Sequence, residues 1–395
     1  MKRTLAFLLL ATFGGCSSAE MPAPEPQPLP CPKVSGVICT VAGNGVAGDG
    51  ADGLPLQKTM LYTPSDIAFA PDGALAIVDW NNHRIRLSQP DGSLKIVAGI
   101  GELTPALGTD QVTDRLNHPT DVTFDPQGRM VIAAWHNSRI KRLEPSGMLV
   151  DIAGTGARSY DGDNGPALSA ILNLPASVVY DPAGNLLVSD QANQRIRMIE
   201  PVNMIITTIA GTGLPQGFAG DGGPAAQAKF NLPIGQRGHP AAHITRSDAG
   251  DIYLADTDNN RIRRIDPAGM ISTVAGTGVA GAENPEGLAT EAQLEHPVDV
   301  AIAPDGALYI ADTENNCIRM VRDGRISTVA GVCTRVCPAD LKHPCRCPSV
   351  DDTCIGDRGA ARSAYLKRPT GIAFDRDGNL FIADTLNHRI RVVWR

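Results

Sequence analysis

Short apolar runs alternate with turn residues along this chain, and one combination of the two recurs six times. The clearest copy, DIYLADTDNNRIRRI at residues 251–265, has an apolar strand ending in Ala-Asp, a polar turn, and a second strand beginning Arg-Ile-Arg. The other copies begin at Ala76, Met130, Leu186, Leu308 and Leu380. A unit repeated in this way predicts a repeat architecture, in which each unit buries its apolar face against the next.

Each repeat is expected to form four strands. The first strand follows a proline, at residues 65–70, 120–125, 176–181, 242–247, 298–303 and 370–375, and a glycine turn such as PDG or RDG leads into the strand pair described above. Another turn precedes a fourth apolar segment, at residues 94–99, 149–154, 205–211, 271–276 and 326–331. Strands this short, β-branched and regularly spaced predict an all-β fold.

The number of fourth strands predicts how the array closes. Five repeats are followed by a fourth strand of their own, but the sixth is followed only by Trp394 and Arg395. The missing segment, ICTVAG, stands at residues 38–43. We therefore expect residues 38–43 to pair with residues 389–393 and to close a ring of six blades, which removes the strand edges that an open array would expose.

The pattern P-x-x-[IV]-x-x-x-x-x-G-x-[LI]-x-[IV]-[AS]-D-x-x-x-x-R-I-R resembles the NHL repeat. The links GDGADG and AGDGGPAAQAKFNLP are similar to those of a common bacterial variety of it. The resemblance extends over residues 37–395 and implies a six-bladed β-propeller, in agreement with the strand count.

The first residues resemble an export signal. Lys2 and Arg3 precede an apolar run at residues 5–13, which is too short to span a bilayer, and then Gly14, Gly15 and Cys16. The small residues before Cys16 resemble the lipobox of bacterial lipoproteins, which implies cleavage before Cys16 and lipid attachment to its sulfur. An ordinary cleaved signal is the alternative. We expect a signal peptide at 1–15, a lipidated proline-rich linker at 16–36, the propeller at 37–395, and an envelope location at the outer membrane, cell surface or periplasm.

The remaining cysteines are even in number, which in an exported protein predicts disulfides. They are Cys31, Cys39, Cys317, Cys333, Cys337, Cys345, Cys347 and Cys354, and several fall in a cysteine-rich insertion at 331–355. Because this insertion, Cys39 and Cys317 belong to neighbouring blades, we expect a cluster that clamps the closure of the ring. Metal binding by the insertion is the alternative, although it lacks paired C-x-x-C motifs.

An aspartate at the end of the second strand stands five residues before an arginine in most repeats, as Asp79 does before Arg84. Across a two-strand turn this spacing predicts a carboxylate–guanidinium pair at the corner. Because the pair recurs, we interpret it as structural. Ala134 in repeat two and Cys317 in repeat five break the pattern, so those corners are expected to be looser or held otherwise.

A second set of polar residues is expected at the mouth of the central channel. Two residues after the proline of each first strand, with an offset of one in repeat four, stand Asp66, Asp121, Ser177, His243, Asp299 and Gly371. Carboxylates this close repel one another unless a cation, a protonated histidine or hydrogen bonds compensate. One interpretation is a site for calcium or another divalent cation at Asp66, Asp121 and Asp299. The other is that each Asp accepts backbone N–H groups of its own turn.

The turns also predict which face recognises a ligand. Links between the second and third strands, and from the fourth strand to the next repeat, carry bulky and charged side chains and emerge on one face, whereas the other links are short. On that face Trp80, His83, Trp135, His136 and His388 could form a surface for a sugar or peptide; packing against neighbouring loops is the alternative.

These observations favour a non-catalytic, membrane-anchored binding scaffold for a protein, peptide or glycan, acting as a monomer. The alternative is a metal-dependent propeller enzyme. A related amidating lyase uses histidines directly after the first-strand proline, but those positions here hold Ser65, Thr120, Ala176, Ala241, Val298 and Thr370. The calcium-dependent gluconolactonase-like propellers remain possible through the channel aspartates. A net charge of −7 argues against nucleic acid as a partner.

Overall fold

A computed structural model describes residues 31–101, 115–234, 240–333 and 355–395 of the chain. The chain divides into two compact units, Met1–Cys31 and Pro32–Arg395, and the strands of the described residues all belong to the second. Within the described residues, no helix combines the length and the hydropathy that a membrane crossing requires. The proposed signal peptide and Cys16 lie outside the described residues.

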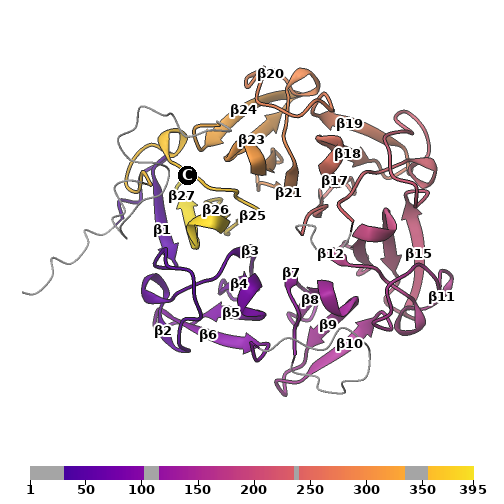
Figure 1. Ribbon diagram of the computed structural model, residues 1–395, viewed down its shortest axis with the longest axis horizontal. Coiled ribbons are helices and arrows are strands. Elements are labelled where there is room, and N and C mark those ends of the chain that lie inside the picture. The colour runs from indigo at the N-terminus through magenta and orange to yellow at the C-terminus, as the bar shows by residue number, and fades with distance from the viewer. Residues whose placement is uncertain (1–30, 102–114, 235–239, 334–354) are drawn as a thin grey trace, which may run out of the picture. The chain divides into compact units, whose positions relative to one another are not determined.

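The described strands of Pro32–Arg395 form six antiparallel sheets arranged as the blades of a ring (Figure 1). From the innermost strand outward, blades one to three are β3 (Pro64–Phe69), β4 (Leu75–Asp79), β5 (Arg84–Ser88), β6 (Ser93–Ala98); β7 (Pro119–Phe124), β8 (Met130–Ala134), β9 (Arg139–Leu143), β10 (Leu149–Ala153); and β12 (Pro175–Tyr180), β13 (Leu186–Asp190), β14 (Arg195–Ile199), β15 (Ile205–Ala210). Blades four to six are β16 (Ile244–Arg246), β17 (Ile252–Asp256), β18 (Arg261–Ile265), β19 (Ile271–Ala275); β21 (Pro297–Ile302), β22 (Leu308–Asp312), β23 (Cys317–Arg322), β24 (Arg325–Ala330); and β25 (Gly371–Phe374), β26 (Leu380–Asp384), β27 (Arg389–Val393), β1 (Ile38–Ala42). The predicted all-β propeller is confirmed.

The ring closes as the strand count predicts. Strand β1 is the outermost strand of blade six and runs antiparallel to β27, with Ile38 opposite Val393 and Ala42 opposite Ile390. Ile38 is fully buried in the apolar cluster between blades five and six. In Figure 1 the indigo β1 lies beside the yellow β27, so the two ends of the propeller sequence share one sheet.

The core lies between adjacent blades rather than at the centre of the ring. One cluster, for example, joins Val131 and Ile140 of blade two to Val188 and Ile206 of blade three. The contacts are mostly aliphatic, because each strand presents alternate β-branched residues to the next sheet. Burial of each such side chain stabilises the fold by about 1.5–3 kcal/mol.

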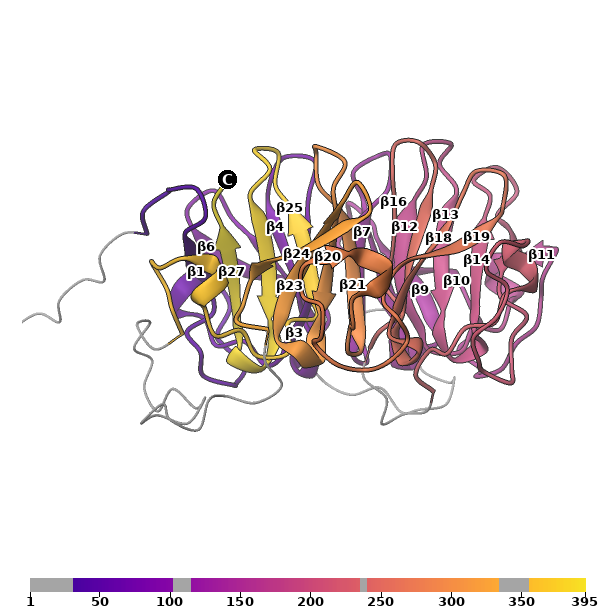
Figure 2. The ribbon, with the colours of Figure 1, turned by 90° about the horizontal axis from the view of Figure 1, so that it is seen from above.

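Two kinds of connection separate onto two faces (Figure 2). Short hairpins join the first strand to the second and the third to the fourth on one face. On the opposite face, 3-10 turns join the second strand to the third: η2 (Trp80–Asn82), η3 (Trp135–Asn137), η5 (Gln191–Asn193), η7 (Thr257–Asn259), η9 (Thr313–Asn315) and η11 (Thr385–Asn387). The links between blades begin and end on this second face, as the sequence predicts. We call it the link face.

The links also return along the outer edges of the blades, which the sequence did not predict. Two-residue strands in three links pair with fourth strands: β2 (Leu54–Pro55) with β6, β11 (Gly165–Pro166) with β15, and β20 (Gly287–Leu288) with β24. Links also contain η1 (Leu56–Lys58), η4 (Ala167–Ser169), η6 (Ala225–Gln227), η8 (Ala289–Glu291) and η10 (Ala361–Ser363). Part of the link length therefore covers strand edges instead of forming a recognition loop.

Candidate functional site

The repeated aspartate is buried at the corner between the second strand and the 3-10 turn. In blade one, Asp79 accepts the N–H of Tyr62 at 2.8 Å through Oδ1 and the side-chain amide of Asn82 at 2.8 Å through Oδ2. The same two bonds recur at Asp190, Asp256, Asp312 and Asp384. Burial raises the pKa of Asp190 and of Asp312 to about 6, although these hydrogen-bond donors and a nearby arginine each act to lower it.

The arginine that pairs with this aspartate is seven residues further along, so the prediction of a partner at five residues is wrong. Arg86 Nε donates to Asp79 Oδ2 at 2.7 Å, and both side chains are fully buried. The same pairing joins Arg197 to Asp190, Arg263 to Asp256, Arg319 to Asp312 and Arg391 to Asp384. The reason is that residues two apart on a strand share a face, and only the second arginine of Arg-Ile-Arg lies deep enough to reach the buried carboxylate.

The first arginine of the motif instead donates to a carbonyl of the link that follows the fourth strand. The guanidinium of Arg84 donates to the carbonyl of Ile100, that of Arg195 to the carbonyl of Thr212, and that of Arg261 to the carbonyl of Thr277. In blade five this position is Cys317, and a disulfide to Cys333 joins the same two segments. In blade two, which has Ala134 in place of the aspartate, Asn137 Oδ1 accepts the N–H of Asn117, and Lys141 pairs with Asp151. Both exceptional corners are thus held by other contacts.

The described disulfides do not include a clamp between blades. The Cys317–Cys333 disulfide joins β23 of blade five to the link that follows β24 of the same blade, and Cys31 and Cys39 are also disulfide-bonded. Cys333 therefore has no thiolate to offer the alternative metal site of the insertion. Cys337, Cys345, Cys347 and Cys354 lie outside the described residues.

His83 and His388, predicted on the ligand-binding face, hold blades together. Each ends a 3-10 turn in the left-handed conformation, with φ of 55° and 53°. His83 Nδ1 accepts the N–H of His118 and His388 Nδ1 accepts that of Thr63, both at 3.1 Å. Gln194, Asn260 and Asn316 make the same bond from the same position. The recurrence indicates a structural role for these two histidines.

Trp80, Trp135 and His136 pack into a cluster instead of forming an exposed aromatic surface. Trp135 is 0% exposed and contacts Leu174, Ala176 and Ala192 of blade three, with Trp80 packed against the same group. Of the two interpretations of Trp135, packing is therefore confirmed, because blade three offers an apolar site that buries its large ring.

His118, which the sequence did not single out, completes this cluster. Its ring lies 4.2 Å from that of His83 and 4.7 Å from that of His136. Burial, together with His83 and His136, lowers the pKa of His118 to about 3; burial, together with Arg158 and His83, lowers that of His136 to about 4. These imidazoles are neutral at pH 7 and belong to the packing between blades.

The predicted channel residues do form a ring. Asp66, Asp121, Ser177, His243 and Asp299 are each at most 7% exposed. Except for His243, each of these residues uses a side-chain oxygen to accept a backbone N–H from the next blade, namely that of the residue directly after the equivalent ring position. Asp66 Oδ2 accepts from Val122 at 3.3 Å, and Asp121 Oδ2 from Val178 at 2.7 Å. Ser177 Oγ accepts from Ile244 at 3.1 Å, and Asp299 Oδ2 from Ile372 at 2.7 Å. Asp299 also bonds its own neighbour Val300. The expected backbone bonds exist, but most of them join blades rather than staying within one turn.

Gly371 completes the ring by having no side chain. A Cβ at this position would lie 2.6 Å from the Cα of Asp66 and 2.7 Å from the carbonyl oxygen of Ser65. Blades six and one therefore approach each other at a distance that only glycine permits. The last position of the ring is closed by backbone contact.

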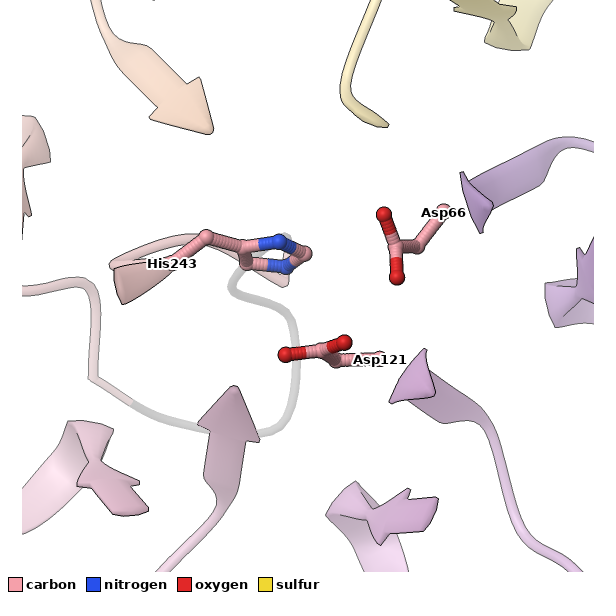
Figure 3. Close-up of side chains that lie close together, drawn as sticks. All are labelled: Asp66, Asp121 and His243. Carbon is pink, nitrogen blue, oxygen red and sulfur yellow. The ribbon is translucent and has the colours of Figure 1, made fainter. Parts of the chain in front are cut away.

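Asp66, Asp121 and His243 point toward one another inside the ring (Figure 3), with one ligand atom of each within 4.8 Å of the others. His243 Nδ1 lies 3.4 Å from Asp299 Oδ1, so Asp299 stands behind the imidazole. Burial raises the pKa of Asp66 well above its usual value, and the charges of Asp121 and Asp299 raise it further. Burial opposes a charge on His243, but Asp299 and Asp121 raise its pKa.

Two cavities open elsewhere, between blades on the face of the short hairpins. One of 420 Å³ lies between blades two and three and is lined by Asp125, Arg129 and Tyr180. The other, of 350 Å³, lies between blades five and six and is lined by Asp305, Tyr309 and Arg395. The hairpin face is therefore less plain than the sequence predicts, although no predicted site residue lines either cavity.

Comparison with known proteins agrees with this architecture. Residues 366–393 match the NHL repeat, and residues 239–322 match the Teneurin NHL domain. Human Teneurin-1 is 28% identical over 380 residues, which is 91% of this chain but 13% of that protein. The chain thus spans only a small part of the curated relatives that it matches.

Two solved bacterial structures share the fold. A protein of unknown function from Bacteroides thetaiotaomicron is 20% identical with a TM-score of 0.62, over 90% of this chain and 75% of that chain. A protein from Bacteroides ovatus described as an auxiliary nutrient binding protein is 17% identical with a TM-score of 0.59, over 90% and 76%. The present protein is a six-bladed β-propeller that contains NHL repeats. Its first and last strands share one blade.

Proposed function

We propose that this protein is a non-catalytic binding scaffold of the bacterial cell envelope, anchored by lipid at Cys16, which recognises a protein or peptide on its link face. The observation that carries the proposal is an exposed aliphatic residue at one repeated position of the links, directly after the Gly-x-Gly that follows the fourth strand. Val46 is 46% exposed, and Leu214 and Val279 are each 60% exposed. Solvent-exposed aliphatic side chains repeated around a ring are typical of an interaction surface rather than of a core.

The position of these residues supports the link face as the recognition surface. Ala47, next to Val46, bridges Leu61, and Ala280, next to Val279, bridges Leu294. Leu61 and Leu294 stand shortly before the innermost strands β3 and β21, which start on the link face. All three aliphatic residues follow the ends of fourth strands, where the links begin, so they lie on the side of the ring that carries the 3-10 turns.

The chemistry of this surface favours a protein or peptide over a glycan. Of the aromatic residues that the sequence offered for a sugar, Trp135 is buried and Trp80 packs against its group. The exposed rings of Tyr160 and Phe218 in the links stack on arginine side chains. A propeller of the same fold described as a nutrient binding protein supports a binding role in general. The alternative of a propeller hydrolase, lactonase or lyase is less well supported, because the channel cluster is at most 7% exposed and a substrate must contact the groups that act on it.

The binding surface is tested with the triple variant Val46→Ser/Leu214→Ser/Val279→Ser. A peptide library displayed on phage is selected against the wild-type protein, and the affinity of the selected peptides is measured by calorimetry. We expect at least a tenfold loss in the triple variant, because the exposed aliphatic contacts are removed while the core is unchanged.

The matched control is Met148→Ser/Val202→Ser, which removes exposed apolar side chains from the hairpin face. This variant is expected to bind as the wild type does. Equal binding by the triple variant, or selection of peptides that depend on Met148 and Val202, would show that the link face is not the recognition surface.

The anchor is tested separately, by fractionation of bacterial cells that express the full chain. The Cys16→Ala variant lacks the sulfur that would carry the lipid, so it is expected to move from the detergent-dependent membrane fraction to the soluble envelope fraction. Cys31→Ala is the control and should remain with the membranes. If Cys16→Ala still requires detergent for extraction, the proposed lipid attachment is wrong.

A further inference from the structure

We propose that Asp66, Asp121 and His243 bind one divalent transition-metal ion of the zinc class inside the channel ring. The three residues come from blades one, two and four, and their ligand atoms lie within 4.8 Å of one another. His243 reaches from one side of the channel toward the two aspartates on the other (Figure 3). A metal held by these side chains would tie distant parts of the ring together across its centre.

The first argument is an unpaired atom. His243 is 2% exposed, and its Nε2 has no hydrogen-bond partner among the described residues. Leaving a buried polar atom without a partner costs about 1–3 kcal/mol. This nitrogen belongs to the imidazole whose edge faces Asp66 and Asp121, so a metal ion between them would satisfy it.

The second argument is the residue behind the imidazole. A histidine that ligates a metal usually gives its other ring N–H to a carboxylate, which fixes the orientation of the ring. Asp299 Oδ1 lies 3.4 Å from His243 Nδ1, and the carboxylate of Asp299 is itself held by the N–H groups of Val300 and Ile372. Asp299 is thus a positioning residue, not the third ligand that the sequence suggests.

The donor set determines the class of metal. Calcium takes six to eight oxygen ligands, whereas imidazole nitrogen together with carboxylate oxygen suits zinc and its neighbours in the first transition series. Donors around one zinc ion lie about 2 Å from it. Binding would therefore draw the three ligand atoms closer together than the 4.8 Å within which they now lie. Of the divalent cations that the sequence suggests, this donor set therefore favours a zinc-class ion over calcium.

The ring bonds alone do not account for the cluster. Asp66 and Asp121 each use Oδ2 to hold the next blade, and Ser177 makes the same kind of bond without a charge. A neutral hydroxyl is thus sufficient for the structural task. Carboxylates so close together gain from a cation, which offsets their mutual repulsion.

The test is zinc uptake by untagged, oxidised, full-length protein that has been stripped with chelator and dialysed. Bound zinc is counted by elemental analysis after equilibrium dialysis against zinc chloride, and cobalt is used in parallel for its visible absorption bands. We expect Asp121→Asn and His243→Gln each to bind one equivalent fewer than the wild type. Because wild type and variants share the cysteine-rich insertion, any zinc bound there cancels when their bound equivalents are compared. Asp299→Asn should keep the site but weaken it about 10- to 100-fold.

Ser177→Ala is the matched control, because it alters the same ring without removing a ligand, and it should bind the full wild-type equivalent. Asp121→Asn keeps an oxygen for the N–H of Val178, so its ring bond survives; folding of every variant is checked by circular dichroism. If Asp121→Asn and His243→Gln both fail to fold, the proposal is tested on the wild-type protein by its thermal unfolding. Excess zinc is then expected to raise the melting temperature more than excess calcium does. Equal uptake by all variants, loss of the same equivalent in Ser177→Ala, or no larger shift with zinc overturns the proposal.

Discussion

Replacement of Arg263 by methionine is expected to lower the free energy of unfolding by about 3–5 kcal/mol, the usual cost of removing one partner of a buried ion pair. Arg263 is fully buried, and it donates to Asp256 at 3.1 Å and to Asp221 at 2.7 Å. Methionine fills much of the same volume but leaves the Asp256 carboxylate buried without its counter-charge. The loss is measured by urea unfolding followed by circular dichroism.

Arg261→Met, on the same strand, is the matched control. Arg261 stacks on Phe218 at 3.9 Å and donates to the carbonyl of Thr277, near the surface. Its loss should cost about 1 kcal/mol, since an exposed cation–π contact contributes about 0.5–1 kcal/mol. A greater loss in Arg261→Met than in Arg263→Met would restore the pairing at five residues and contradict the structure.

Removal of the borrowed strand is expected to have the largest effect on the fold. A chain that begins after residue 43 lacks β1, so β27 becomes an exposed edge and the site occupied by Ile38 is empty. Ladder hydrogen bonds and buried side chains are lost together, and their sum is comparable with the whole stability of a typical domain, about 5–15 kcal/mol. We expect this truncated protein to aggregate and to show no cooperative thermal transition.

The matched control is a chain that begins at Cys31. It lacks the proposed signal and most of the proposed linker but retains β1, and it is expected to be soluble and to unfold cooperatively. Size-exclusion chromatography and differential scanning calorimetry distinguish the two. Cooperative unfolding of the shorter chain near the temperature of the longer one would mean that β1 is dispensable.

The fold was predictable because its signals are local and repeated. Alternating apolar residues, glycine turns and a count of fourth strands are sufficient to place β1 against β27, since every copy of the repeat gives the same answer. The 3-10 turns were predictable as polar turns in the same way. The return of the links along the outer edges was not, because residues 54–55, 165–166 and 287–288 are too few to show a strand pattern.

The site was only partly predictable, because its contacts cross from one blade to the next. The sequence identifies the ring position that holds Asp66, Asp121, His243 and Asp299, since it follows each proline at nearly constant spacing. It does not show that Asp66 holds Val122 of the next blade, or that Asp299 stands behind His243. Nor does the sequence decide between exposure and packing for Trp135, because the residues that cover it belong to a different repeat.

The shared last blade also constrains when the molecule can take shape. Ala42 pairs with Ile390, so one half of this sheet is synthesised long before the other. At about 5–20 residues per second, the ribosome needs on the order of tens of seconds to pass from one to the other. Every other blade is assembled from nearly consecutive sequence, but this one waits for the last residues of the propeller. A chain interrupted at any point before them cannot close, so the ring is completed only after its last strand has been made.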